Sequence, residues 1–167
     1  MKTNSYFDIG ANLTHESFDK DLITVIEEAK QNNVKKICIT STSIEDTRVS
    51  LKLLENDQNF FITTCGIHPH YADTFEESNI REIKELSKHP SVKAIGETGL
   101  DFNRNYSKKD NQILCFKSQI EVAQDLNLPL FLHQREAHKD FMNCFSNIDL
   151  KVNAVSYTHL TLPTKVT

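Results

Sequence analysis

The chain has 167 residues, of which 38% are hydrophobic and 25% charged, which excludes a disordered or collagen-like chain and suits one domain with a buried core. Its net charge of -4 excludes attraction of nucleic acid by the overall field, so a polyanionic substrate would need a local basic patch or a bound cation. No apolar run reaches the roughly 18 residues of a membrane-spanning helix, and residues 1–7 lack the core of a secretory signal, so we expect a cytoplasmic protein without membrane contact.

Short apolar runs alternate with longer amphipathic segments along the chain. The expected strands are Tyr6–Leu13, Lys35–Thr40, Phe60–Ile67, Val92–Glu97, Leu130–His133 and Val152–Val155. The expected helices are Glu16–Asn32, Ile44–Asp57, Glu76–Lys88, Lys108–Leu126 and Ala137–Phe145. This alternation of strand and helix predicts an α/β fold with a parallel sheet.

The cysteines are widely spaced and include no C-x-x-C pair, so we expect neither a disulfide framework nor a zinc ribbon. Cys38 and Cys65 fall in expected strands, where a reduced cysteine packs as a small core residue. This cysteine usage fits a reducing compartment.

An open doubly wound sheet and a TIM (β/α)₈ barrel both fit the alternation of elements. No glycine-rich nucleotide-binding motif follows a strand, which disfavours the common open sheets. Polar residues gather instead after several strands, where barrel enzymes build their sites. A complete barrel needs about 250 residues. We therefore expect a barrel truncated after about five or six strands.

Two residues at the ends of expected strands are candidate metal ligands. Glu97 follows the strand Val92–Ile95 between two glycines, and the unobstructed backbone there would let a carboxylate approach a cation. His133 ends the strand that begins at Leu130, and a histidine with a carboxylate on one face suits a divalent cation. A solvated glutamate in a turn and a hydrogen-bonded core histidine are the alternative interpretations.

Other polar residues near these strand ends are candidates for catalysis, namely His68, His70, Arg104 and Arg135, or for substrate binding. His68 and His70 flank Pro69, which favours a rim loop; we expect them to contact phosphate or transfer protons rather than bind metal directly. Arg104 and Arg135 lie close in sequence to Glu97 and His133 and could neutralise phosphate. The expected substrate-binding residues are Asn12 and Asp101.

Four segments, in this order, resemble the TatD family of metal-dependent hydrolases. They are Phe7–Thr14, Gly66–His70, Ala94–Asn105 and Pro129–His138. The resemblance implies a (β/α)₈ barrel that hydrolyses phosphodiester bonds in DNA with one or two divalent cations, with Glu97 and His133 as metal ligands. It implies Mg²⁺, with Mn²⁺ or Zn²⁺ as alternatives, a DNA substrate with RNA or tRNA as alternatives, and a monomeric intact protein.

The sequence departs from the family pattern at two places. Many members carry His-x-His where this chain has Asn12 and Thr14, which bears on the second metal. After Val155 the family would continue into a His-Cys-Phe segment and a later aspartate, whereas residues 156–167 do not resemble it. We expect residues 1–155 to form the barrel fragment, residues 156–167 to be a spurious tail, and the chain itself to be inactive and poorly stable.

Two other functions remain open from the sequence. The same metal centre could hydrolyse a carboxyl ester, as a D-aminoacyl-tRNA deacylase does, and activity on plain DNA against an aminoacyl ester would separate the two. The chain could also be a fragment without catalytic activity or a protein that only binds.

Overall fold

The computed structural model describes residues 4–146 and 153–156. Its strands are β1 (Tyr6–Ala11), β2 (Val34–Ile39), β3 (Phe61–Cys65), β4 (Val92–Asp101), β5 (Leu130–Arg135) and β6 (Ala154–Ser156). Its helices are α1 (Leu22–Gln31), α2 (Ile44–Leu54), α3 (Glu77–Leu86), α4 (Lys109–Leu126) and α5 (His138–Phe145), with 3₁₀ turns η1 (Glu16–Phe18) and η2 (Pro69–Thr74). The predicted alternation of strand and helix is confirmed.

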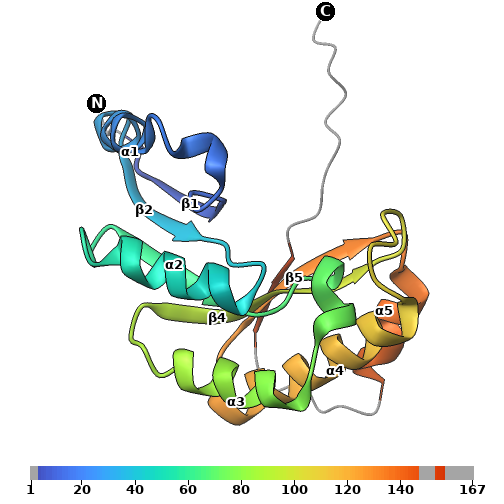
Figure 1. The fold of residues 1–167 in the computed structure, drawn as a ribbon. Coiled ribbons are helices and arrows are strands. Elements are labelled where there is room, and N and C mark those ends of the chain that lie inside the picture. The colour runs from blue at the N-terminus through green and yellow to red at the C-terminus, as the bar shows by residue number, and fades with distance from the viewer. Residues whose placement is uncertain (1–3, 147–152, 157–167) are drawn as a thin grey trace, which may run out of the picture.

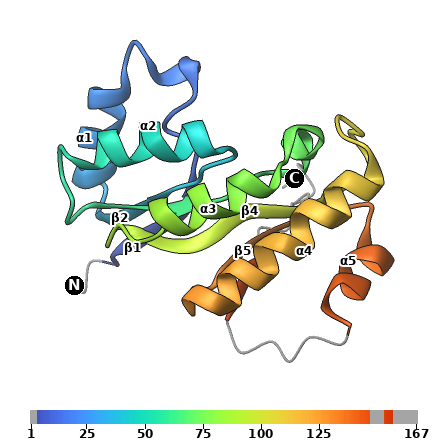
Figure 2. The same cartoon turned by 60° about the horizontal axis from the view of Figure 1, so that its bottom comes forward.

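The six strands form one sheet in the order β1-β2-β3-β4-β5-β6, and all neighbouring pairs are parallel. Because spatial order follows chain order, each helix returns the chain to the next position in the sheet, as in a (β/α)₈ barrel. The sheet curls, and α3 and α4 run along one side of β4 and β5 (Figures 1 and 2). The fold is therefore a curled half-barrel with helices. None of the described helices is both long and apolar enough to cross a lipid bilayer.

The larger hydrophobic core joins β3, β4 and β5 to the helices that cover them. Phe116 and Ile120 of α4 are fully buried in it, and the Phe116 ring stacks on Phe141 of α5 with centroids 5.0 Å apart. A smaller core lies under α1, where Leu22 and Ile26 pack one helical turn apart. Burial of these apolar stripes fixes the side of the sheet on which the helices lie.

Most elements differ from the sequence-based expectation only by a few residues at their ends, and three of the differences bear on the fold. The expected helix Glu16–Asn32 is divided into η1 and α1, and the His15 ring at the start of η1 accepts a hydrogen bond from the amide of Ser17. The strand expected to end at Glu97 continues to Asp101. The last strand is Ala154–Ser156 rather than Val152–Val155, and Val152 lies outside the described residues.

Strand β4 contains a bulge that reorients its second half. Ile95 pairs with Leu130 of β5. Thr98, three residues later, pairs with Leu132, so two residues of β4 stand opposite one of β5. A regular strand would place residues 95 and 97 on the same face, but the extra residue shifts the alternation. Ile95 consequently packs in the core beneath the helices, whereas Glu97 lines the opposite, open face.

Two glycines allow β4 and β5 to approach closely around this bulge. Gly96 has φ +145°, and a Cβ atom there would lie 2.2 Å from the carbonyl oxygen of Phe131. Gly99 has φ +146°, and a Cβ atom there would lie 1.9 Å from the carbonyl oxygen of His133. Both positions therefore require glycine for conformation and for space.

We expect Gly99→Ala to lower the free energy of unfolding by about 3 kcal/mol, because the methyl group would push β5 away and the backbone would be strained. Urea denaturation measures this change. Lys93→Ala, at an exposed position of the same strand, should change stability by less than about 0.5 kcal/mol. Equal stability of the two variants would show that the strands tolerate a wider separation.

Candidate metal centre

An open cleft of about 640 Å³ lies at the carboxyl ends of the strands. All eight residues that the sequence nominated for a site line this cleft. They are Asn12, His68, His70, Glu97, Asp101, Arg104, His133 and Arg135. Parallel strands bring their carboxyl ends to one edge, which explains why residues far apart in the sequence converge there.

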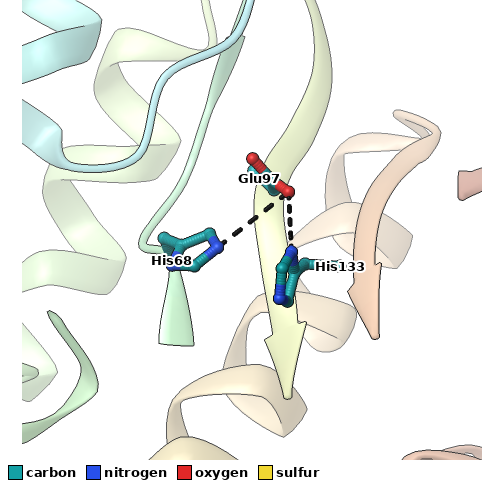
Figure 3. A group of neighbouring side chains, drawn as sticks. All are labelled: His68, Glu97 and His133. Carbon is teal, nitrogen blue, oxygen red and sulfur yellow. Dashed lines mark hydrogen bonds and ion pairs between the residues drawn. The ribbon is translucent and has the colours of Figure 1, made fainter. Parts of the chain in front are cut away.

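Glu97, His133 and His68 form the centre of the cleft (Figure 3). A carboxylate oxygen of Glu97 lies 3.0 Å from Nδ1 of His133 and 3.9 Å from Nε2 of His68. Each residue offers one ligand atom, and these atoms all lie within 4.8 Å of one another. Two imidazoles and a carboxylate make a donor set that suits Zn²⁺, Mn²⁺ or a similar cation, so the residues present fit a divalent metal.

His133 is held between two carboxylates. Its Nδ1 faces Glu97, and its Nε2 lies 3.3 Å from Oδ2 of Asp101. Carboxylates only accept hydrogen bonds, so a neutral imidazole can donate to only one of them. Donation from Nε2 to Asp101 would place the electron pair of Nδ1 on the side of Glu97, where a cation could accept it. A histidine that binds metal generally has this arrangement, with its second nitrogen donating to a carboxylate or carbonyl.

His68 has the opposite arrangement. Its Nδ1 accepts a hydrogen bond of 3.2 Å from the backbone amide of His70 at the start of η2. The proton of a neutral ring must then sit on Nε2, the nitrogen that faces Glu97. Burial lowers the pKa of His68 to about 3, so the ring is neutral at physiological pH. His68 therefore presents a hydrogen-bond donor to the cleft in this conformation.

Asp101 connects several parts of the site. Its Oδ2 lies 2.9 Å from Nε2 of His70, and its Oδ1 accepts hydrogen bonds from the backbone amides of Asn103 and Arg104. Burial alone would raise the pKa of Asp101, but the hydrogen bonds from Arg104, His70 and Asn103 outweigh it and lower the pKa to about 2. The carboxylate is therefore ionised at neutral pH.

Asp101 lines the cleft but is almost completely buried. The residue is 1% exposed, and both of its oxygens contact protein groups. This geometry lets Asp101 orient His70 and His133, and its role in substrate binding stays a prediction.

The remaining predicted residues surround the centre. His70 is half-buried on η2, the rim turn that Pro69 begins. Arg104 is exposed in the loop after β4, and Arg135 is half-buried at the end of β5. Asn12 is exposed after β1, and its side-chain oxygen accepts a long hydrogen bond from Thr14. The structure brings these side chains to one cleft.

Sequence reasoning missed the polar residues that follow β2. Thr40, Thr42 and Asp46 also line the cleft, and the side chain of Thr42 donates a hydrogen bond to Asp46. The Thr40 hydroxyl is buried and has no hydrogen-bond partner among the described residues. Their signal was present in the sequence, since a polar run directly after an apolar strand marks the site edge of a barrel.

Comparison with known proteins identifies relatives of this site and fold. Residues 7–162 match the sequence pattern of the family described as TatD related DNase. The match continues beyond Val155, where the sequence had suggested a boundary. The curated "3'-5' ssDNA/RNA exonuclease TatD" of Musicola paradisiaca is 45% identical over 136 residues, which are 81% of this chain and 52% of that protein. Its Yersinia pseudotuberculosis counterpart is 41% identical over 137 residues, 82% of this chain and 53% of that protein.

Solved structures agree with these matches. A TatD family hydrolase from Entamoeba histolytica has a TM-score of 0.78 at 27% identity, covering 87% of this chain and 55% of that one. An uncharacterized amidohydrolase from Saccharomyces cerevisiae has a TM-score of 0.76 at 27% identity, covering 84% of this chain and 51% of that one. The chain spans about half the length of the curated relatives it matches. With most of its length matched by the family pattern and its half-barrel shared with these hydrolases, the chain belongs to the TatD related DNase family.

Proposed function

We propose that this site, in a protein of the full length of its relatives, belongs to a metal-dependent hydrolase that cleaves phosphodiester bonds in DNA, most favourably at the end of a single strand. The unsubstituted protein and the variants tested below are therefore chains of that full length. The observation that carries this proposal is the contact of 3.0 Å between Glu97 and Nδ1 of His133. The other ring nitrogen of His133 lies 3.3 Å from the carboxylate of Asp101. Relatives named single-stranded DNA and RNA exonucleases favour a nucleic acid over an aminoacyl ester, and RNA is the alternative substrate.

The cation would be held by Glu97 and by Nδ1 of His133, together with water. When bound, a divalent cation supplies a Lewis acid that lowers the pKa of a bound water and offsets negative charge on the phosphate. The identity of the cation stays a prediction: Mg²⁺ from the family resemblance, with Mn²⁺ or Zn²⁺ as the ions that an imidazole ligand suits better.

The neighbouring side chains would bind and orient the phosphate. The Nε2–H of His68 points toward Glu97 and could donate a hydrogen bond to a phosphate oxygen next to the cation. His70, held by Asp101, offers a second imidazole at the rim. Arg104 and Arg135 place two guanidinium groups along the cleft, which suits the charge that develops on phosphate during cleavage.

The different hydrogen bonds of the two histidines predict different losses on substitution. We expect His133→Gln to weaken Mn²⁺ binding at least about 10-fold, because it removes a ligand. His68→Leu, which has no hydrogen-bond donor, should leave Mn²⁺ affinity within about 3-fold of the unsubstituted protein but slow metal-dependent release of nucleotides from single-stranded DNA about 100-fold. Calorimetric titration and a nuclease assay measure the two effects, with His138→Gln outside the cleft as the control. Equal loss of metal affinity in both variants would make His68 a ligand.

We expect Asp101→Asn to weaken Mn²⁺ binding about 10- to 100-fold without direct contact with the ion. The amide oxygen can still accept from the backbone amides, but its NH₂ group would then face His133 and draw the ring proton to Nδ1. The ¹⁵N chemical shifts of the His133 ring in metal-free protein report this change of tautomer. Asp125→Asn, a surface carboxylate paired with Lys84, is the control. An unchanged tautomer together with unchanged affinity would contradict the proposed role.

A further inference from the structure

An aromatic side chain stands beside His70, one of the histidines that line the cleft. Tyr106 lies in the loop between β4 and α4 and is 63% exposed. Its ring meets the ring of His70 edge to face, with centroids 4.7 Å apart and planes at 82°. The His70 ring in turn lies 6.3 Å from that of His133. Tyr106 is therefore separated from a proposed metal ligand by a single imidazole.

The loop that carries Tyr106 is fixed to the neighbouring rim turn. The hydroxyl of Ser107 donates to the carbonyl oxygen of His70 at 2.9 Å and accepts from the amide of Asp73 at 3.1 Å. The carboxylate of Asp73 accepts hydrogen bonds from the backbone amide of Lys108 and the side chain of Asn111. Ser107 itself is buried. These bonds on either side of the rim hold the exposed ring in a set position rather than leaving it on a free loop.

The surroundings of Tyr106 favour a nucleotide as the group that would cover it. Arg104, two residues earlier in the same loop, lines the cleft, as does Arg135. Tyr71, on the same rim turn as His70, also lines the cleft and is 50% exposed. Aromatic rings combined with basic side chains along a groove are the combination that binds single-stranded nucleic acid, where rings stack on bases and cations follow the phosphates.

We propose that Tyr106 is a stacking platform for the base of an unpaired nucleotide next to the phosphate that is cleaved. This proposal rests on the proposed nuclease function and adds the reason for its preference for single strands. A base in a duplex has both faces covered by its neighbours, so it must leave the stack before it can lie on Tyr106. An unpaired end presents its base without that cost, and stacking tolerates any sequence because every base has an aromatic face.

The test measures binding of a fluorescein-labelled ten-residue thymidine oligomer by anisotropy, with EDTA present so that no bond is cleaved. We expect Tyr106→Ala to weaken binding about 10-fold, while Tyr106→Phe, which keeps the ring, stays within about 2-fold of the unsubstituted protein. Tyr6→Ala removes a tyrosine of similar exposure, 56%, on β1 outside the cleft, and should leave binding unchanged. Thermal melting of each variant checks that the fold is kept.

A second oligomer separates stacking from a general effect on the cleft. An abasic oligomer of equal length keeps every phosphate but has no bases. The unsubstituted protein should bind it about 10-fold more weakly than the thymidine oligomer, and Tyr106→Ala should bind both equally. If the unsubstituted protein binds and cleaves the thymidine oligomer and Tyr106→Ala binds it equally well, that result would overturn this inference and leave the proposed function intact. Failure of the unsubstituted protein to bind or cleave any oligomer would overturn the proposed function, and this inference with it.

Discussion

The close approach of β4 to β5 is the constraint on which the candidate site depends. Glu97 and His133 are 36 residues apart in the sequence and lie on neighbouring strands. The Oε1 atom of Glu97 is nevertheless 3.0 Å from Nδ1 of His133. That distance requires a backbone without Cβ atoms at Gly96 and Gly99, because a methyl group at either would overlap a carbonyl of β5. Gly96 and Gly99 therefore allow β4 and β5 to approach each other closely, in addition to leaving space for a cation beside Glu97.

A second level of organisation lies in the hydrogen bonds behind the cleft. His133 and His70 both direct Nε2 toward the same oxygen of Asp101, whereas His68 receives a backbone amide on Nδ1. If His133 donates from Nε2 to Asp101, its Nδ1 presents an electron pair to the cleft, whereas His68 presents the proton on its Nε2. Because the pKa of Asp101 and the pKa of His68 are both lowered, Asp101 stays ionised and His68 stays neutral across the physiological range.

Much of this arrangement could be predicted from the sequence, because it follows from the periodic pattern of apolar residues and from the place of polar residues after the strands. The strands and helices follow from the alternation of apolar and amphipathic segments, and the convergence of the nominated side chains follows from the parallel sheet. The bulge could not be predicted: Gly96 to Gly99 reads as a turn, and only the pairing with Leu130 and Leu132 shows that β4 continues. The contacts of Asp101 with His70 and His133 join residues more than 30 positions apart in the sequence, which periodicity does not reveal.

The clamp between Ser107, Asp73 and the carbonyl of His70 has a consequence for how this surface can diverge. In barrel enzymes the loops at the carboxyl ends of the strands usually vary independently, and that freedom lets one fold acquire many substrates. Here the segment after β3 and the segment after β4 share hydrogen bonds across a buried hydroxyl. An insertion in either segment would displace the groups that form these hydrogen bonds. We therefore expect the two segments to change length together or to keep their lengths. Among relatives, substrate range should then change by exchange of side chains such as those at positions 71 and 106 on a rim of constant length.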